Sequence, residues 1–215
     1  MRKINVIWAI LLFATYAFAS TETNNIQQTF EKYKSAILNN NGTLAYSVID
    51  QNTRTYYDDL YSKSIFANKD EILSLGLLDR MQVIIMRHRI PPELLITMDG
   101  RKLFEYAVIN GWVGKNSVTK LSSGKITVNG NFATSQVIVN GENTPLYFHF
   151  YKENSSWKID ISEMTKWGEG AFIHQQQNSG LSEQEFIFKL VQIVSGKPVN
   201  PKTIYLPLQF KISNT

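Results

Sequence analysis

The sequence LYFHFYKENSSWKIDISE, residues 146–163, decides the fold of this chain. Its first part, residues 146–151, is a run of aliphatic and aromatic residues, and apolar and polar residues alternate over residues 157–162. Between them, residues 153–156 read ENSS, a composition that is typical of turns. Two extended runs joined by a polar turn predict a β-hairpin.

The first strand of this hairpin is apolar or aromatic on both faces. Side chains of a strand point alternately to opposite faces, so Phe148 and Phe150 share one face with Leu146. The other face carries Tyr147, His149 and Tyr151. Each face therefore needs cover, and we expect the core to cover the first and C-terminal helices or a partner to cover the second.

Two Asn-Gly pairs predict further hairpins before this one. Asn129-Gly130 and Asn140-Gly141 flank the run Phe132–Val139. Asn-Gly between alternating runs is the strongest short-range hairpin signal. With the chain extended from about Lys115, the sequence predicts a four-stranded antiparallel meander.

Helical periodicity dominates the chain on both sides of this sheet. Two capping boxes, Asn68 with Glu71 and Ser182 with Glu185, each open a helix. An extended apolar tail follows over residues 204–210. The helices predicted before the sheet are Asn24–Leu38, with Asn24 and Gln27 as a capping pair, Leu44–Ile49, a helix from Thr53, Ile72–Arg89, Glu93–Met98 and Arg101–Ile109.

This order of elements predicts an α+β fold. N-terminal helices pack on a curved antiparallel sheet, and a C-terminal helical extension lies over the sheet's outer face. We expect the main domain at residues 20–163, and the helical extension with its extended tail at residues 164–215.

The first nineteen residues have the pattern of a signal peptide. Arg2 and Lys3 precede a largely apolar run, and Ala17-Phe18-Ala19 is a small-x-small cleavage site. The apolar run is shorter than the roughly 20 residues of a membrane span, so no stable membrane insertion is expected. The sequence thus predicts an exported protein, periplasmic or secreted.

Charge and cysteine content exclude several classes of function. The chain carries 22 Lys and Arg against 18 Asp and Glu, and loss of Arg2 and Lys3 would leave a charge of only +2. The charges are spread singly along the chain, so no nucleic-acid partner is expected. Because the chain has no cysteine, it has neither disulfides, nor thiolate metal ligands, nor a lipid-modified cysteine.

The hairpin carries a motif, Phe-x-Phe-x-Lys-Glu-x-x-x-Trp-Lys-Ile-Asp, over residues 148–160. Together with the helix at residues 30–38 and the Asn-Gly-Thr sequence after it, this motif resembles the nuclear transport factor 2-like (cystatin-like) superfamily. The resemblance covers residues 24–163 and indicates an exported bacterial member. It implies a cone-shaped cavity between helices and sheet. It implies no single activity, because the superfamily includes isomerases, polyketide cyclases, dehydratases, transport factors, immunity proteins and assembly domains.

An enzyme with such a cavity needs an acid or base in the cone, with a partner that polarises a carbonyl group. His149 is the obvious candidate, but the Phe-x-Phe pattern favours Phe148 and Phe150 as the residues that face the cone. His149 then lies on the outer face, and no catalytic residue is assigned. Candidate ligand-binding residues at the cavity mouth are Tyr57, Tyr61 and Trp112, together with Asp50; aromatic residues of this kind are more often part of the core. Asp160 alternates with Trp157 and Ile159, which predicts a solvated carboxylate.

The remaining candidates have structural interpretations. Arg87-His88-Arg89 ends a predicted helix, where cations complement the helix dipole; an anion site is the alternative. His88, His149 and His174 are far apart with no ligand spacing, so no metal site is expected, and no cofactor motif occurs.

The leading functional hypothesis is an exported, non-enzymatic binding or interaction protein of unknown ligand. Its predicted interface is Tyr147, His149 and Tyr151, and a homodimer through the sheet is one form that it could take. A small-molecule enzyme of the isomerase, cyclase or dehydratase type is the alternative, and an immunity protein against a secreted toxin is a third.

Overall fold

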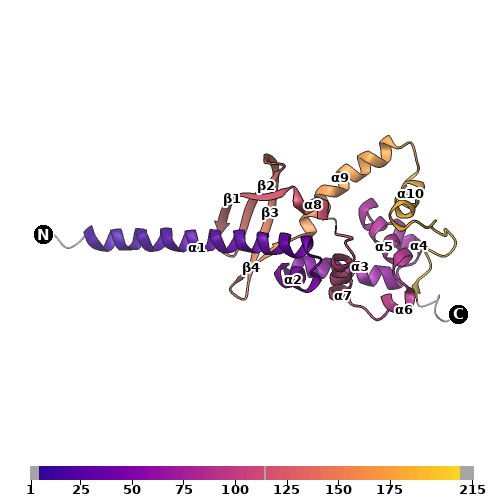
Figure 1. Cartoon of the computed structure of the whole chain (residues 1–215), viewed down its shortest axis with the longest axis horizontal. Coiled ribbons are helices and arrows are strands. Elements are labelled where there is room, and N and C mark those ends of the chain that lie inside the picture. Colours follow the sequence, from indigo (N-terminus) through magenta and orange to yellow (C-terminus); the bar gives the residue numbers. More distant parts are fainter. Residues whose placement is uncertain (1–4, 114, 209–215) are drawn as a thin grey trace. The chain divides into compact units, whose positions relative to one another are not determined.

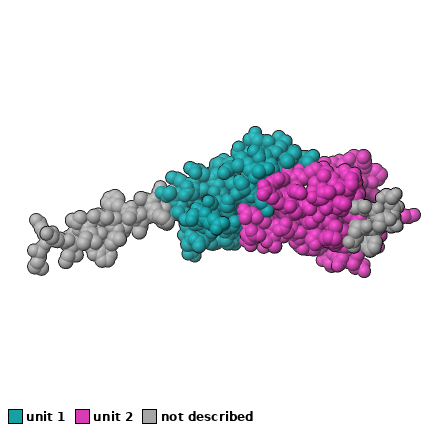
Figure 2. Space-filling view, turned by 90° about the horizontal axis from the view of Figure 1, so that it is seen from below, with its two compact units in different colours: residues 1–50, 107–161 teal, residues 51–106, 162–215 magenta. Residues whose placement is uncertain are grey.

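The computed structural model describes residues 5–113 and 115–208, with the side chains of residues 5–20, 116 and 117 left out. The fold is α+β, as predicted, with helices that precede a curved antiparallel sheet (Figure 1). The chain forms two compact units (Figure 2). Unit 1 comprises Met1–Asp50 and Ala107–Ile161, and unit 2 comprises Gln51–Tyr106 and Ser162–Thr215. Each unit thus combines two separate stretches of chain, and the predicted domain boundary after residue 163 stays a prediction.

The sheet lies in unit 1 and is the predicted meander. Its strands are neighbours in chain order and all adjacent pairs are antiparallel. The strands are β1 (Leu121–Asn129), β2 (Phe132–Val139), β3 (Glu142–Glu153) and β4 (Ser156–Asp160).

Left-handed backbone conformations form the tight turns of this sheet. Asn140 and Gly141 have φ values of 52° and 85°, and Asn154 and Ser155 have values of 47° and 63°. Two consecutive residues with positive φ match the right-handed twist of the flanking strands. The first turn consists of Gly130 and Asn131, because Asn129 still pairs with Phe132 and belongs to β1. All three predicted hairpins are therefore confirmed.

Helix α1 (Asn5–Leu38) contacts β1 and β4 and forms the core of unit 1 with the sheet. The rings of Phe30 and Phe148 are 4.9 Å apart, and Phe148 is 1% exposed. Ile26, Ile37 and Phe150 are fully buried. Helices α2 (Gly42–Val48) and α8 (Lys115–Thr119) both contact α1.

Two expectations for unit 1 are wrong. The first helix begins at Asn5 and not at Asn24, so Asn24 lies inside α1 and does not cap it. The chain at Lys115 is helical in α8, and the sheet begins only at Leu121. Helix α8 has only five residues, little more than one helical turn. So short a helix leaves no clear periodicity in the sequence before the extended pattern begins. The signal peptide stays a prediction, because residues 1–4 lie outside the described residues and no side chain of residues 5–19 is described.

Unit 2 is helical, and α5 (Leu77–Arg89) lies at its centre in contact with α3, α4, α6, α9 and α10. The C-terminal helices α9 and α10 therefore pack on α5, while their predicted place over the sheet stays a prediction. The other helices are α3 (Gln51–Phe66), α4 (Lys69–Leu73), α6 (Pro92–Leu95), α7 (Gly100–Ile109, the end of which belongs to unit 1), α9 (Ser162–Asn178) and α10 (Glu183–Ser195).

The predicted continuous helix Ile72–Arg89 is wrong, because the chain breaks between α4 and α5. Gly76 is extended, with ψ 156°, and precedes the first residue of α5. The Glu169 carboxylate accepts hydrogen bonds from the backbone N–H groups of Leu77 and Leu78, at 2.7 and 2.9 Å. A carboxylate at this position satisfies free N–H donors and complements the helix dipole. A side chain 92 residues away in the sequence therefore stabilises the start of α5.

The buried guanidinium of Arg87 holds the C-terminal tail, for which the sequence indicated no partner. It donates hydrogen bonds to the Ile204 and Leu206 carbonyl oxygens, at 3.2 and 3.1 Å. It also donates to three carbonyl oxygens near the end of α3, at 2.6–3.0 Å, namely those of Lys63, Ser64 and Ala67. Burial lowers the pKa of Arg87 to about 10, so the group is still charged at neutral pH. The described tail residues Ile204 and Leu208 are buried, and Ile204 lies within a run of turns, so the predicted extended tail is wrong there.

Candidate functional site

The outer surface of β2 and β3 in unit 1 carries six directly paired side chains, which we call the aromatic face. Tyr147 on β3 is 46% exposed, whereas Phe150, three residues further along the strand and on its opposite face, is fully buried. The rings of Phe132 and His149 meet edge to face at 5.4 Å, and those of Phe132 and Tyr151 lie 5.2 Å apart. The pairs are Phe132 with Tyr151, Thr134 with His149, and Gln136 with Tyr147. The predicted interface residues thus lie together, and the sequence reasoning missed Phe132.

His149 belongs to this outer face and not to the core of the sheet. Its strand neighbours Phe148 and Phe150 are 1% and 0% exposed, while His149 itself is half-buried. The alternation of burial along β3 therefore follows the period of two that the sequence predicts.

The three predicted ligand-binding aromatic residues lie in different units. Tyr57 and Tyr61 belong to α3 in unit 2, and Trp112 follows α7 in unit 1. The ring of Tyr57 contacts Phe104 edge to face at 4.9 Å, and burial raises the pKa of Tyr57 to about 12. Burial, with a smaller contribution from nearby Asp99, also raises the pKa of the Tyr61 hydroxyl. The Trp112 backbone N–H donates to the Ala107 carbonyl oxygen at 2.8 Å. No single unit holds all three residues.

Asp160 is 2% exposed, so the prediction of a solvated carboxylate is wrong. Its strand is not a free edge at this point, because Ile49 forms a parallel bridge with Ile159. The Asp50 backbone N–H donates to the Ile159 carbonyl oxygen at 3.0 Å, and Asp50 is 1% exposed. Residues 49 and 50 thus lie beside β4, and both Asp50 and Asp160 are buried.

A polar groove of about 360 Å³ runs along β4 in unit 1, and we call it the β4 groove. One wall is the exposed stripe of α1 that contains Thr29 and Lys32. The end of α2 and residues 155–158 of the last hairpin form the other walls. Thr29 Oγ1 donates to the Trp157 carbonyl oxygen at 3.3 Å, which ties α1 to β4. Because these segments lie far apart in the sequence, no local pattern indicates the groove.

A buried carboxylate also joins α1 to the sheet of unit 1. Glu22 is 7% exposed and accepts hydrogen bonds from Lys152 Nζ at 2.9 Å and from Trp157 Nε1 at 2.5 Å. The bond from Lys152, and to a smaller extent that from Trp157, lowers the pKa of Glu22. The Lys152 ammonium also lies 5.7 Å from the centre of the Trp157 ring. Glu22 is therefore neutralised by a structural partner.

Unit 2 has a second groove, of about 490 Å³, between α3, α5 and α9; we call it the Tyr56 groove. The Tyr56 hydroxyl donates to Asp79 Oδ1 at 2.6 Å and accepts from Gln82 Nε2 at 2.7 Å. Burial, followed by the bond to Asp79, raises the pKa of Tyr56. Lys166 of α9 also lines the groove. Tyr56 therefore stays protonated, and its hydroxyl orients the Asp79 carboxylate.

The other two predicted histidines have hydrogen-bonding partners within the chain. His88 Nε2 lies 3.0 Å from Ser195 Oγ and 3.1 Å from the Lys197 carbonyl oxygen. His174 contacts the Asn178 side-chain amide on the same helix. Within the described ranges, no group of three or more His, Asp or Glu is placed to hold a metal ion.

Comparison with known proteins shows that no family model, no curated protein and no solved structure matches the chain. Among the helices in the described part of the chain, none has both the length and the apolar character of a membrane span.

Proposed function

We propose that this chain is an exported, non-enzymatic binding protein that associates through the aromatic face of its sheet. The observation that carries the proposal is the pairing of aromatic and polar side chains on β2 and β3, with Tyr147 46% exposed. Exposed tyrosine supplies large contact area together with a hydrogen-bonding group, a combination that is enriched in interfaces. The cystatin-like cone that the sequence resemblance implies is part of this proposal.

A second copy of the chain is the partner to which we commit. The six paired residues of the aromatic face include no Lys, Arg, Asp or Glu. These six residues therefore add no repulsion between like charges when two copies meet, and a two-fold interface uses the same surface twice.

Replacing Tyr147 and Tyr151 together with serine is expected to weaken self-association at least roughly tenfold, because large aromatic side chains carry much of the free energy of an interface. Sedimentation velocity over a range of protein concentrations measures the change. Ile193→Ser is the matched control, because Ile193 is 67% exposed and lies on α10 in unit 2. The proposal fails if the wild-type protein is a monomer throughout, or if the double variant and the control associate equally well.

A small-molecule enzyme is the second candidate, and the Tyr56 groove favours it. The Tyr56 hydroxyl lies 2.6 Å from Asp79 Oδ1, and both residues line the groove. An enzyme that uses a carboxylate as general base, with a hydroxyl group as its partner, requires this arrangement. This pair lies in unit 2, whereas the resemblance implied a site against the sheet.

Native mass spectrometry of the protein purified from its own host tests the second candidate. If the Tyr56 groove holds a substrate or product, the wild-type protein should carry added mass, and Asp79→Asn should release most of it because a charge-assisted contact is lost. Asp70→Asn is the control, because Asp70 is an exposed carboxylate outside the groove. A wild-type protein without added mass, or equal retention by both variants, would count against an enzyme site here.

A further inference from the structure

Strand β1 forms an open edge of the sheet in unit 1. Within the described part of the chain it pairs with β2 alone, whereas Ile49 forms a bridge to β4 at the opposite edge. An edge strand presents backbone N–H and C=O groups that can pair with a further strand. The groups on the open side of β1 are therefore available to a partner wherever no other part of the chain covers them.

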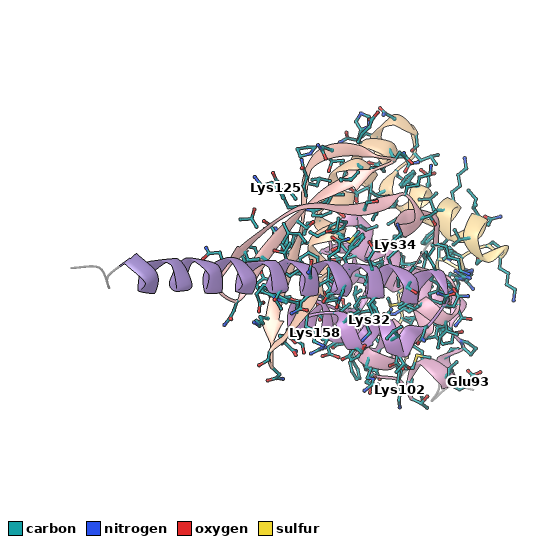
Figure 3. The ribbon with its side chains drawn as sticks, turned by 60° about the vertical axis from the view of Figure 1, so that its left-hand side comes forward. Lys32, Lys34, Glu93, Lys102, Lys125 and Lys158 are labelled. Atoms are coloured by element: carbon teal, nitrogen blue, oxygen red, sulfur yellow. The ribbon has the colours of Figure 1, made fainter. Side chains whose placement is uncertain are left out.

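The two ends of β1 differ in how this edge is protected. At the start of the strand, Lys34 of α1 donates to the Leu121 carbonyl oxygen at 2.7 Å. A β-bulge follows at residues 123–126, and Lys125 within it is exposed. Figure 3 shows Lys125 clear of α1. Bulges and edge lysines hinder pairing with another chain. Residues 126–129, Ile-Thr-Val-Asn, contain neither a bulge nor a charge.

The register of β1 shows which backbone groups point to the open side. Asn129 pairs with Phe132 across a two-residue turn, which directs the backbone groups of both residues towards each other. Successive residues of a strand direct these groups to opposite sides, so those of Val128 and Ile126 point away from β2. Neither residue has a hydrogen bond on that side to another described residue.

Val128 also leaves apolar surface at this edge. It pairs with Ala133, which is fully buried, so both side chains lie on the inner face of the sheet. Val128 is nevertheless 37% exposed. A strand added beside β1 would cover this side chain together with the open backbone groups.

We propose that residues 125–129 of β1 pair antiparallel with the same residues of a second copy, around a two-fold axis at Thr127. In this register Thr127 lies opposite Thr127 of the second copy, and Ile126 lies opposite Val128. The two pairs of Ile126 with Val128 are hydrogen-bonded pairs, each of which exchanges two bonds. Cross-strand pairs of threonine and of β-branched residues are favourable.

The charge of this segment fits a second copy. Lys125 lies opposite Asn129 of the second copy, and not opposite another lysine. The two Lys125 residues are separated by four positions along the strands, which is about 13 Å at a rise of about 3.3 Å per residue. This separation exceeds the Debye length of about 8 Å at physiological salt, so their repulsion is screened.

The edge contact goes beyond the association that we propose through the aromatic face and does not rest on it. Five residues on each side form a smaller interface than the roughly 20–30 residues a side of a stable complex. We therefore expect a weak, transient pairing, which a disulfide can trap.

A single cysteine at position 127 tests the pairing, because the chain has no cysteine of its own. Opposite residues of a non-hydrogen-bonded pair have Cα atoms about 4.5 Å apart, within the range for a disulfide. Oxidised glutathione should therefore convert Thr127→Cys into a disulfide-linked dimer, which non-reducing electrophoresis measures. Thr127 is exposed and has no side-chain hydrogen bond to a described residue, so the substitution keeps the fold.

Asn129→Cys is the matched control, because Asn129 is an exposed residue on the same face of the same strand. Thr127→Cys should cross-link at least roughly tenfold faster, since the two copies of residue 129 lie about 13 Å apart, beyond the Cα limit of about 7 Å for a disulfide. Equal rates for the two variants would indicate random collision and overturn the pairing.

Val128→Pro in the Thr127→Cys chain tests the backbone hydrogen bonds. Proline lacks the N–H group, and here only a donor on the open side is lost, so the sheet stays intact. Circular dichroism checks the fold. Cross-linking should slow roughly tenfold, because each copy loses one hydrogen bond across the axis. An unchanged rate would overturn the proposed register.

A Thr127→Cys chain that also carries Tyr147→Ser and Tyr151→Ser separates this contact from the aromatic face. An unchanged rate of cross-linking shows that the edge pairs by itself, even if the association through the aromatic face fails. A rate that falls to that of Asn129→Cys would assign the contact to the aromatic face and overturn edge pairing.

Discussion

Replacing Arg87 with methionine is expected to lower the free energy of unfolding by about 3–5 kcal/mol, the largest effect that we predict for a single side chain. The guanidinium donates to five carbonyl oxygens, three near the end of α3 and two in the C-terminal segment. Methionine fills a similar volume but donates no hydrogen bond, so buried carbonyl groups lose their partners. Part of the loss is offset because a buried charge no longer has to be desolvated.

Urea denaturation followed by circular dichroism measures this loss, and hydrogen exchange locates it. Protection should fall first at residues 200–208 and at the end of α3, which Arg87 joins. Arg89→Met is the matched control on the same helix, because Arg89 is only half-buried, and its cost should stay within about 1 kcal/mol. If Arg87→Met and Arg89→Met unfold at the same urea concentration, the hydrogen bonds of the Arg87 guanidinium contribute nothing to stability.

Adding one methyl group at Gly100 is expected to destabilise unit 2 by about 3 kcal/mol, at the upper end of the range for overpacking. Gly100 is buried and is the first residue of α7. A Cβ atom there would lie 2.6 Å from the backbone nitrogen and 2.7 Å from the Cα atom of Asp58 on α3. Backbone atoms cannot rotate away as a flexible side chain can, so the two helices must separate.

Gly170→Ala is the control for this prediction. Gly170 lies within α9 and has no heavy atom within 4 Å of the position where a Cβ would lie. Alanine should therefore stabilise the helix by roughly 0.5–1 kcal/mol, because glycine loses more backbone entropy on folding. Thermal unfolding of both variants gives the comparison. A Gly100→Ala protein as stable as the wild type would contradict the close approach of α7 to α3.

The candidate sites differ in how far the sequence predicted them. The period of two along β3 placed Tyr147, His149 and Tyr151 on one face, and this follows from local backbone geometry alone. Phe132 was missed because its place beside Tyr151 depends on the register between strands. The β4 groove and the Tyr56 groove were missed because each combines residues from segments that only the folded chain brings together.

By itself, the sequence determined the local elements of this protein. The alternating run Phe132–Val139, the turn at Asn140-Gly141, and the capping boxes at Asn68 and Ser182 all appear in the structure as predicted. These features depend on residues within about four positions of one another, so local steric and hydrogen-bonding rules decide them.

Only the tertiary structure decided the break before α5, the hydrogen bonds of the buried Arg87 guanidinium and the division of the chain into two units. Glu169 reaches Leu77 across 92 residues, Arg87 reaches Ile204 across 117, and Trp157 reaches Glu22 across 135. The predicted helices left Gly100 in the gap between them, whereas in the structure its missing side chain lets α7 approach the backbone of α3. Contacts over such separations form because buried polar groups need partners wherever the fold places them, and periodicity along the chain does not encode which partner that will be.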